Sequence, residues 1–425
     1  MDLAGWLAYI ERQHPQAIAL GLDRVRAVLD RLATPKPCPI LTVGGTNGKG
    51  STCAVIESIL LAAGYRVGCY TSPHLLRYNE RVRVNGREAD DAALVAAFQE
   101  IDVARGDTAL TYFEFGTLAA WLVLARAGPD ALVLEIGLGG RLDAVNAFEP
   151  DCAILTSVAL DHREYLGDTR ATIGWEKAHI FRPATPAVVG DPSPPQSVLD
   201  HAREIGAGLQ LIGRDFGYHA EPRQWRYFGP GGTRAGLAYP ALRGAKQLAN
   251  AACAIAALDS LRERVPFGAQ DIRRGLAAVE LPGRFQVLPG RPTVILDVAH
   301  NPEAAAVLAE GLAGMGRYRR TLAVIGMLRD KDVAGVCRAL HGRIDCWYAA
   351  TLDNPRGATA EEVEQGIVRS GAGGEVRRFA SPREALVAAQ GDAGEDDRIV
   401  AFGSFYTVAE VMAARAATPR SPDAG

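Results

Sequence analysis

A glycine-rich segment, residues 41–52, with one lysine followed by two hydroxyl side chains, Ser51 and Thr52, has the composition of a phosphate-binding site. It reads LTVGGTNGKGST, an apolar run followed by a glycine-rich turn and Lys49. Backbone N–H groups of such a turn and the N-terminus of the next helix attract phosphate oxygens, and the lysine adds a positive charge. The segment differs from Gly-x-x-x-x-Gly-Lys-Ser/Thr, because Val43 and Gly50 replace a glycine and a hydroxyl. The alternative is a glycine-rich connection with a solvated lysine. We predict a phosphate site in this segment, with Lys49 as its positive charge.

Glu135 is a carboxylate inside an otherwise apolar strand pattern, residues 131–136. A buried carboxylate costs several kcal/mol unless it is paired or bound to a cation. Beside a phosphate site the natural cation is Mg2+, which prefers carboxylate and hydroxyl oxygens. We therefore expect Glu135 to bind Mg2+, with a structural Glu–Arg pair as the alternative. Arg141 and Asp143 follow, and we expect them to form a charge pair at the carboxyl end of the strand, where ligands bind in open α/β sheets.

Three further polar groups follow predicted strands. Residues 71–86 are dense in hydrogen-bonding groups, and we expect a loop that lines an anion and metal site rather than an ordinary surface loop. His162 follows another strand, where a metal ligand, a general base and a capping histidine are all compatible with its position. Asp297 and His300 lie at the carboxyl end of a predicted strand in the second half of the chain, which is again a position where ligands bind in α/β sheets. Asn301 then begins a helix, as an N-cap would.

Strand-like apolar runs alternate with helical patterns over most of the chain, as is typical of α/β proteins. In the first series we expect strands at 39–43, 131–136, 153–158 and 186–189, and helices at 51–63, 117–127 and 248–261. Residues 209–243 have no helical spacing and suggest short antiparallel strands and loops. In the second series we expect strands at 294–298, 322–325, 346–350 and 399–402, and helices near 303–314, 331–341, 359–370, 382–390 and 406–415.

The two series predict two domains. We expect a P-loop-type, mostly parallel, doubly wound sheet domain in residues 1–285, which carries the phosphate site, and a smaller Rossmann-like α/β domain in residues 291–417. Residues 281–292 are rich in proline and glycine and form the predicted joint. Residues 418–425 are expected to be disordered.

Composition favours a cytoplasmic enzyme. The 425 residues are 48% hydrophobic and 22% charged with a net charge of −3, so disorder is not indicated and no basic excess suggests a nucleic-acid or membrane partner. Seven cysteines without a Cys-x-x-Cys pair indicate neither zinc nor a disulfide framework and fit reduced thiols in the cytosol. We expect no signal peptide and no membrane span.

Several segments resemble the folylpolyglutamate synthase/dihydrofolate synthase family in its bifunctional bacterial form, relatives of the Mur peptide ligases, over about residues 15–415. The loop at 45–51 is shared in outline with Mur ligases and indicates only the superfamily. More specific are YTSPHL at 70–75, TYFEF at 111–115, LEIGLGGRLDAVN at 134–146, EKAHIFRP at 176–183 and DVAHNP at 297–302, supported by GMLRDKD at 326–332 and FGSF at 402–405. Tyr406 departs from the pattern, because relatives often carry histidine there.

The resemblance implies an ATP-dependent ligase that joins L-glutamate to dihydropteroate and to folates through an acyl phosphate. It implies catalytic roles for Lys49, His162, Lys177 and His300, with Lys177 carbamylated. It places ATP at Gly48, Lys49, Gly50, Ser51, Asn250, Arg284 and Asp297, where the two domains meet. It places Mg2+ at Ser72 and Glu135, with His162 on the same ion or on a second one. The dihydropteroate portion is expected at Thr111, Tyr112, Phe113, Glu114, Leu142, Asp143 and Ala144. The resemblance also implies a monomer.

Three alternatives remain open from the sequence. The first is a folylpolyglutamate synthase that acts only on reduced folates. The second is a Mur-type amino-acid ligase, although the phosphate loop begins near residue 45 and leaves little room for a UDP-sugar domain before it. The third is a nucleotide-binding regulator, which would not need Glu135, His162 and Lys177 together.

Overall fold

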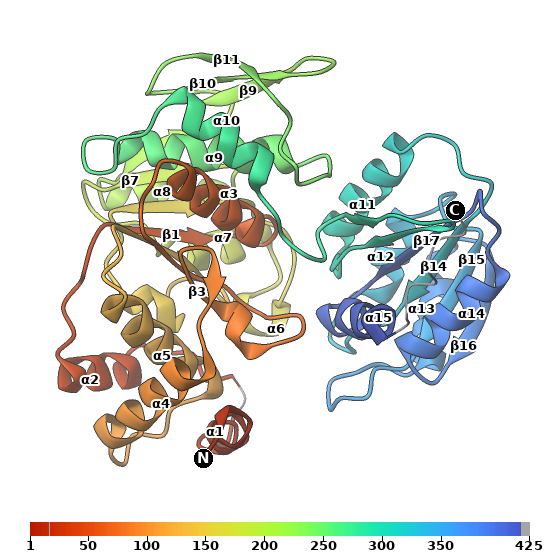
Figure 1. The fold of residues 1–425 in the computed structure, drawn as a ribbon, viewed down its shortest axis with the longest axis horizontal. Helices are drawn as coiled ribbons and strands as arrows, with labels where there is room; N and C mark the ends of the chain where they lie inside the picture. Colours follow the sequence, from red (N-terminus) through yellow and green to blue (C-terminus); the bar gives the residue numbers. More distant parts are fainter. Residues whose placement is uncertain (17, 418–425) are drawn as a thin grey trace, which may run out of the picture. The chain divides into compact units, whose positions relative to one another are not determined.

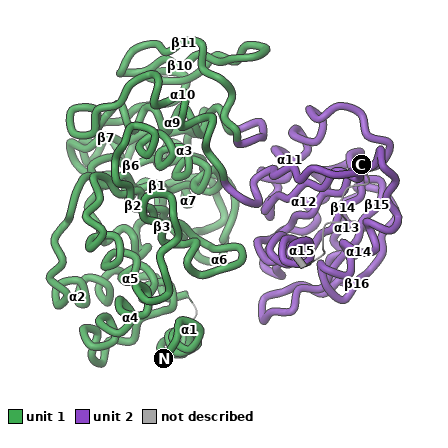
Figure 2. Tube along the Cα trace, in the orientation of Figure 1, with its two compact units in different colours: residues 1–241, 247–280 green, residues 242–246, 281–425 purple. Residues whose placement is uncertain are grey.

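The chain forms two compact units in a computed structural model that describes residues 1–16 and 18–417 (Figures 1 and 2). The first unit comprises residues 1–241 and 247–280, and the second comprises residues 242–246 and 281–425. The division therefore falls at the start of the proline- and glycine-rich joint, and residues 281–285 belong to the second unit. The tail at 418–425, which we expected to be disordered, lies outside the described residues.

The first unit is built on an eight-stranded sheet with the order β4-β3-β2-β5-β1-β6-β7-β8. Pairing is parallel from β2 to β8, and β3 and β4 add antiparallel at one edge. Every residue of β1, β5 and β6 is buried, as expected for apolar strands covered on both faces. The strands are β1 (Ile40–Gly44), β2 (Val67–Tyr70), β3 (Val82–Val84), β4 (Arg87–Glu88), β5 (Ala131–Glu135), β6 (Cys152–Leu155), β7 (Pro186–Val189) and β8 (Gly208–Leu211).

Helices cover both faces of this sheet, which confirms the doubly wound prediction. Figure 1 shows α3, α9 and α10 on one side of β1 and α4 and α5 on the other. The helices are α1 (Leu3–Ile10), α2 (Asp23–Leu32), α3 (Lys49–Ala62), α4 (Asp91–Arg105), α5 (Tyr112–Arg126), α6 (Arg163–Leu166), α7 (Arg170–Ala178), α8 (Gln196–Glu204), α9 (Gln247–Ser260) and α10 (Ala269–Ala278), with short 3-10 turns η1 (Tyr78–Arg81) and η2 (Ala144–Ala147).

Two features of the first unit differ from the prediction. The expectation of antiparallel strands throughout residues 209–243 is wrong at its start, because β8 pairs parallel with β7. The remainder does form a three-stranded antiparallel sheet of β9 (Gly217–Ala220), β10 (Trp225–Phe228) and β11 (Arg234–Leu237). Helix α5 begins at Tyr112 rather than residue 117, because Thr111 and Glu114 form a capping box.

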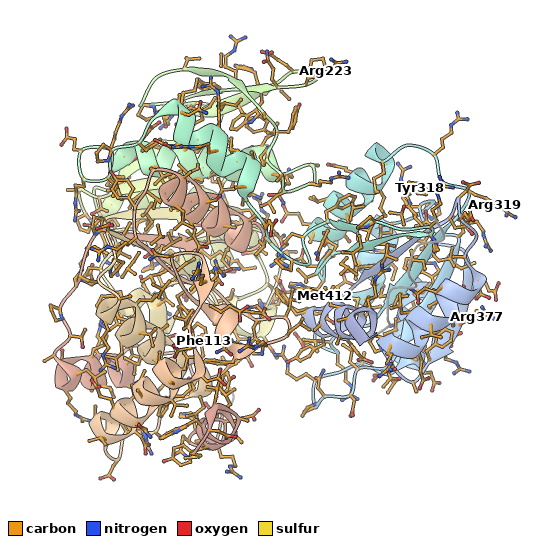
Figure 3. The ribbon with its side chains drawn as sticks, in the orientation of Figure 1. Phe113, Arg223, Tyr318, Arg319, Arg377 and Met412 are labelled. Atoms are coloured by element: carbon orange, nitrogen blue, oxygen red, sulfur yellow. The ribbon has the colours of Figure 1, made fainter. Side chains whose placement is uncertain are left out.

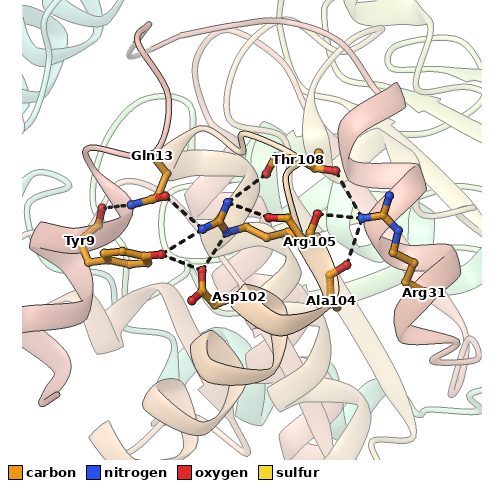
Figure 4. Close-up of polar contacts among 8 residues, drawn as sticks. Tyr9, Gln13, Arg31, Asp102, Ala104, Arg105 and Thr108 are labelled. Carbon is orange, nitrogen blue, oxygen red and sulfur yellow. Dashed lines mark hydrogen bonds and ion pairs between the residues drawn. The ribbon is translucent and has the colours of Figure 1, made fainter.

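The N-terminal helices are tied to the end of α4 by a polar network (Figure 4). The Tyr9 hydroxyl donates to Asp102 Oδ1 at 3.0 Å and accepts from Arg105 Nη2 at 2.9 Å. Arg105 also donates to Gln13 Oε1 at 3.1 Å. Arg31 of α2 donates to the last carbonyls of α4 at 2.8 and 3.1 Å, which otherwise lack helical partners. These bonds fasten α1 and α2 to α4.

The second unit has a six-stranded sheet with the order β12-β13-β17-β14-β15-β16. Its strands are β12 (Gln286–Leu288), β13 (Thr293–Leu296), β14 (Thr321–Ile325), β15 (Cys346–Ala350), β16 (Glu375–Phe379) and β17 (Arg398–Phe402). Helices α11 (Pro302–Gly314), α12 (Val333–Ala339) and α13 (Ala360–Ser370) pack in a row, and α14 (Pro382–Asp392) packs on α15 (Phe405–Ala417). Only β12 is antiparallel, so the Rossmann-like prediction is confirmed.

None of the helices in the described part of the chain combines the length and apolar character that a membrane crossing requires.

Candidate active site

Four parallel strands of the first unit end at one edge of the sheet, and each leads into predicted site residues. The order β2-β5-β1-β6 brings together the loops after Tyr70, Glu135, Gly44 and Leu155. Ligands bind at this edge in open α/β sheets. The phosphate loop, the polar segment after β2, the carboxylate of β5 and the loop to His162 therefore share one end of the sheet.

Two of the glycines in the phosphate loop, Gly45 and Gly48, have backbone conformations that favour glycine. Gly45 has φ +142° and Gly48 has φ +90°. A Cβ atom on Gly45 would lie 2.0 Å from Thr156 Oγ1, and one on Gly48 would lie 2.5 Å from Asn250 Oδ1. The loop is therefore pressed against β6 on one side and against the start of α9 on the other. This places Asn250, a predicted ATP-binding residue, directly beside the loop.

Hydrogen bonds fasten the loop to the residues that follow β6. Thr156 Oγ1 donates to the Asn47 carbonyl at 2.7 Å, and Thr46 N–H donates to the Ser157 carbonyl at 2.8 Å. Asn47 N–H donates to Ser157 Oγ at 3.0 Å. Gly48 then begins α3 without a side-chain cap, so the first N–H groups of the helix have no capping side chain and suit an anion. This geometry agrees with the predicted phosphate site.

Two lysines donate to the same carbonyl of this loop. Lys49 Nζ lies 3.1 Å from the Gly45 oxygen and 3.2 Å from the Thr46 oxygen. Lys177 Nζ, on the last turn of α7, lies 3.0 Å from the same Gly45 oxygen. Burial lowers the pKa of Lys177 to about 7, and the nearby Lys49 charge acts in the same direction, against the opposing effects of Asp161 and Asp143. Lys177 is therefore a buried amine that loses its proton near neutral pH.

Two of the three predicted metal ligands are in direct contact. Ser72 N–H donates to Glu135 Oε2 at 3.0 Å, and Glu135 is buried at the end of β5. His162 follows β6, begins α6 with φ +51° and does not cap that helix with its side chain. Among residues 1–16 and 18–417, no three His, Cys, Asp or Glu side chains are grouped to hold a metal ion. A divalent cation at this position would have the Glu135 carboxylate as a ligand and would take its remaining ligands from phosphate oxygens and water.

The polar loop after β2 is held by charged residues that we did not select from the sequence. The Glu80 carboxylate accepts the N–H groups of residues 75–77 at 2.6–2.7 Å. Arg83 donates to Thr71 Oγ1 at 3.1 Å and pairs at 2.7 Å with Glu57 of α3. Glu57 stands in the apolar helix segment AVIESIL, so it could have been selected by the argument that we applied to Glu135.

The predicted substrate segment 111–114 starts α5. Glu114 N–H donates to Thr111 Oγ1 at 3.2 Å, Thr111 N–H donates back at 2.7 Å, and Arg24 pairs with Glu114 at 2.8 Å. Thr111 and Glu114 therefore fix the first turn of the helix. The ring of Phe113 (Figure 3) lies so near Gly137 that a Cβ atom there would come within 2.5 Å of it. The start of α5 therefore lies beside the segment that follows β5, which leads to Leu142, Asp143 and Ala144.

Asp143 and Arg141 do not form the charge pair that we expected. Asp143 Oδ2 accepts from Leu138 N–H at 2.8 Å, and its Oδ1 accepts from Val145 N–H at 3.0 Å. Burial raises the pKa of Asp143 to about 7 against the effect of these bonds. Arg141 instead pairs with Glu176 of α7 at 2.9 Å. The expectation was wrong because Asp143 caps the η2 turn and Arg141 reaches the neighbouring helix.

In the second unit, Arg284, Asp297 and His300 gather around β13. Asp297 accepts two backbone N–H groups at 2.8 Å, and the Arg284 charge partly offsets the rise in its pKa that burial causes. The Arg284 guanidinium lies 4.9 Å from the Phe405 ring centre, and the His300 ring lies 6.4 Å from the same ring. Asn301 Oδ1 accepts from Ala304 N–H at 2.9 Å, which confirms its predicted N-cap role.

Known sequence families match both units. The Mur ligase middle domain matches residues 43–205, and the Mur ligase glutamate ligase domain matches residues 283–405. The dihydrofolate synthase/folylpolyglutamate synthase of Escherichia coli (strain K12) is 48% identical over 411 residues, which cover 96% of this chain and 94% of that protein.

Solved structures agree over the same length. E. coli FolC in complex with DHPP and ADP has a TM-score of 0.93 and 47% identity, and 98% of each chain is covered. A bifunctional folylpolyglutamate synthase/dihydrofolate synthase with Mn, AMPPNP and L-glutamate bound has a TM-score of 0.90 and 46% identity, again over 98% of each chain. The similarity therefore includes both units.

Proposed function

The chain belongs to the dihydrofolate synthase/folylpolyglutamate synthase family of ATP-dependent ligases, and we propose that it joins L-glutamate to dihydropteroate and extends reduced folates through an acyl phosphate. A free carboxylate is a poor electrophile, because its leaving group would be oxide. Transfer of the γ-phosphoryl group of ATP provides phosphate as the leaving group, and the glutamate amine then attacks the carbonyl carbon. The observation that carries this proposal is the phosphate loop with Lys49 at the sheet edge that also bears Glu135.

Phosphoryl transfer needs positive groups around the phosphate oxygens. The backbone of Gly48 and Gly50, the Lys49 ammonium and the Ser51 hydroxyl provide them at the start of α3. A divalent cation, which we propose is Mg2+, would be held by Ser72, Glu135 and His162. When bound, it would neutralise charge that develops on the phosphoryl oxygens.

Lys177 is proposed to be carbamylated. Its neutral amine attacks the carbon of CO2, a C–N bond forms, and one proton is lost to solvent, which leaves a carbamate anion. Support comes from its pKa of about 7 and from the Gly45 carbonyl that it shares with Lys49. A second ammonium beside Lys49 would be repelled, whereas a carbamate would be attracted and could orient groups bound to the metal.

The dihydropteroate portion is proposed to bind between the first turn of α5 and the segment that follows β5. Thr111 and Glu114 hold the first turn of α5 and so present Tyr112 and Phe113 to the ligand. Asp143 is proposed as the partner of the pterin ring, because burial holds its pKa near 7 and it can donate or accept a hydrogen bond. Leu142 and Ala144 flank it.

Further nucleotide-binding residues are proposed within each unit, taken separately. Asn250 lies against the phosphate loop of the first unit. The second unit contributes Arg284 and Asp297 to ATP binding and His300 near the phosphates. A monomeric state and a cytoplasmic location stay predictions.

The test is phosphate release with ATP, Mg2+ and L-glutamate, measured separately with dihydropteroate and with tetrahydrofolate. We expect glutamate-dependent release with both acceptors. Release with tetrahydrofolate alone would favour the folylpolyglutamate-only alternative. ATP hydrolysis that ignores glutamate and both pterins would contradict the proposal.

Lys177→Ala tests the carbamate directly. We expect a large loss of rate that short carboxylates such as formate or acetate partly restore, because they can occupy the space of the missing carbamate. Full activity of this variant without added carboxylate would contradict the proposed role.

A further inference from the structure

The last turn of α7, which carries Lys177, is held by two side chains outside the residues assigned so far. We propose that Asn146 and Arg182 form a clamp that positions Lys177 against the phosphate loop. This inference rests on the proposed function of Lys177, and it assigns positioning residues for that group.

The clamp binds the carbonyl of His179, the C-cap of α7, and that of Phe181 two residues further on. Asn146 Nδ2 donates to the His179 carbonyl at 3.2 Å. Arg182 Nη1 donates to the same carbonyl at 3.1 Å and to the Phe181 carbonyl at 3.2 Å. The last carbonyls of a helix have no partner within the helix. Two side chains that converge on them fix where the helix ends, and Lys177 lies two residues before His179.

The two members of the clamp also hold each other. Arg182 Nη2 donates at 3.1 Å to both the backbone carbonyl and the side-chain oxygen of Asn146, and Arg182 Nε pairs with Glu149 at 2.6 Å. Asn146 Nδ2 donates a second bond to the Arg141 carbonyl at 3.2 Å. The buried Asn146 amide thus uses both its donor group and its acceptor, so its orientation is fixed and no solvent replaces its bonds.

Close backbone packing completes the link between the clamp and Lys177. A Cβ atom on Gly140 would lie 2.7 Å from the Glu176 carbonyl and 2.9 Å from the Lys177 carbonyl. Arg141 N–H also donates to the Glu176 carbonyl at 3.0 Å. These contacts therefore hold the loop that follows β5 at a fixed distance from the last turn of α7. A shift of either by about 1 Å would break the Lys177 bond to Gly45, because hydrogen bonds weaken beyond about 3.2 Å.

The experiment compares Asn146→Leu and Arg182→Lys with Arg234→Lys as a matched control. Arg234 is also a mostly buried arginine of the first unit, paired with Asp259. Melting temperature, kcat, KM for ATP and the carbamate signal from 13C-bicarbonate are measured for each. We expect the clamp variants to lose about 100-fold in kcat and most of the carbamate signal, with KM for ATP changed by less than about threefold. The control should lower the melting temperature while it keeps both kcat and the signal.

The outcomes separate the clamp from the proposed function. Folded clamp variants with a wild-type carbamate signal and kcat would overturn the clamp. Absence of the signal in an active wild-type protein would overturn the proposed role of Lys177 and with it the clamp. If Asn146→Leu does not fold, Gly140→Ala displaces the same turn from the opposite side and must show the same loss.

Discussion

Replacing Lys177 by methionine should remove one contribution to the pH dependence of the free energy of unfolding. The pKa of Lys177 is lowered from its ordinary 10.5 to about 7, chiefly by burial. Since one pKa unit corresponds to about 1.4 kcal/mol, the protonated lysine costs the folded state on the order of 5 kcal/mol. Methionine fills similar space without a charge to desolvate, although it gives up the bond to Gly45, which is worth roughly 1 kcal/mol.

The direction in which stability changes with pH follows from proton binding to Lys177 in the folded and unfolded states. Between pH 7 and 10.5 the unfolded chain holds a proton on this lysine that the folded protein has released, so wild-type stability rises with pH in that window. In buffers purged of CO2, Lys177→Met should be more stable than wild type by roughly 4 kcal/mol at pH 6 and by about 2 kcal/mol at pH 8.5, and the advantage should vanish near pH 10.

Urea unfolding followed by tryptophan fluorescence is a suitable assay, because Trp6, Trp121, Trp175 and Trp225 lie in the first unit and only Trp347 lies in the second. Asp143 also changes its protonation between the two states, but it is present in both proteins and largely cancels in the difference. A stability difference that stays constant from pH 6 to pH 10 would refute the reasoning, because Lys177 would then keep an ordinary pKa.

Three further predictions concern the phosphate loop and the metal site. Lys49→Ala should lower kcat by about 1,000-fold with an unchanged circular dichroism spectrum, and near-normal turnover would contradict the assignment. Glu135→Gln should raise the Mg2+ concentration needed for half-maximal activity by at least about tenfold, and an unchanged metal titration would remove Glu135 from the site. Gly45→Ala should lower the melting temperature by on the order of 5 °C, because its φ of +142° and the Thr156 hydroxyl at 2.0 Å leave no room for a methyl group. Equal melting temperatures of Gly45→Ala and the wild type would show that the loop accommodates the added methyl group.

Periodicity and composition predicted two α/β units and the central strands of both sheets, but not strands β2–β4 or helices α1, α2, α4, α6, α7, α8 and α10. Apolar runs such as β5 and β6 are buried on both faces, so their pattern is strong. Strand β16 was missed because its sequence, EVRRF, is mostly exposed at the sheet edge and carries little apolar signal. Strand β12 was missed because it has only three residues beside a joint rich in proline and glycine.

The site was predictable where a residue type conflicts with its local pattern. Glu135 stands out as a carboxylate within an apolar strand, and Lys49 stands out after a glycine-rich turn. The environment of Lys177 was not predictable from residues alone, because its partner Gly45 is 132 positions away and only the folded sheet brings them together. The predicted pairing of Arg141 with Asp143 was wrong for the same reason, since Glu176, with which Arg141 pairs, lies 35 positions away.

The central claim is that the acceptor acid is activated by phosphorylation before glutamate attacks it. Dihydropteroate labelled with 18O in its carboxylate tests this claim most directly. One labelled oxygen should appear in the inorganic phosphate that is released with each amide bond formed, because the phosphate leaves with the carboxylate oxygen that it bound. Phosphate that carries no label while amide accumulates would contradict the account.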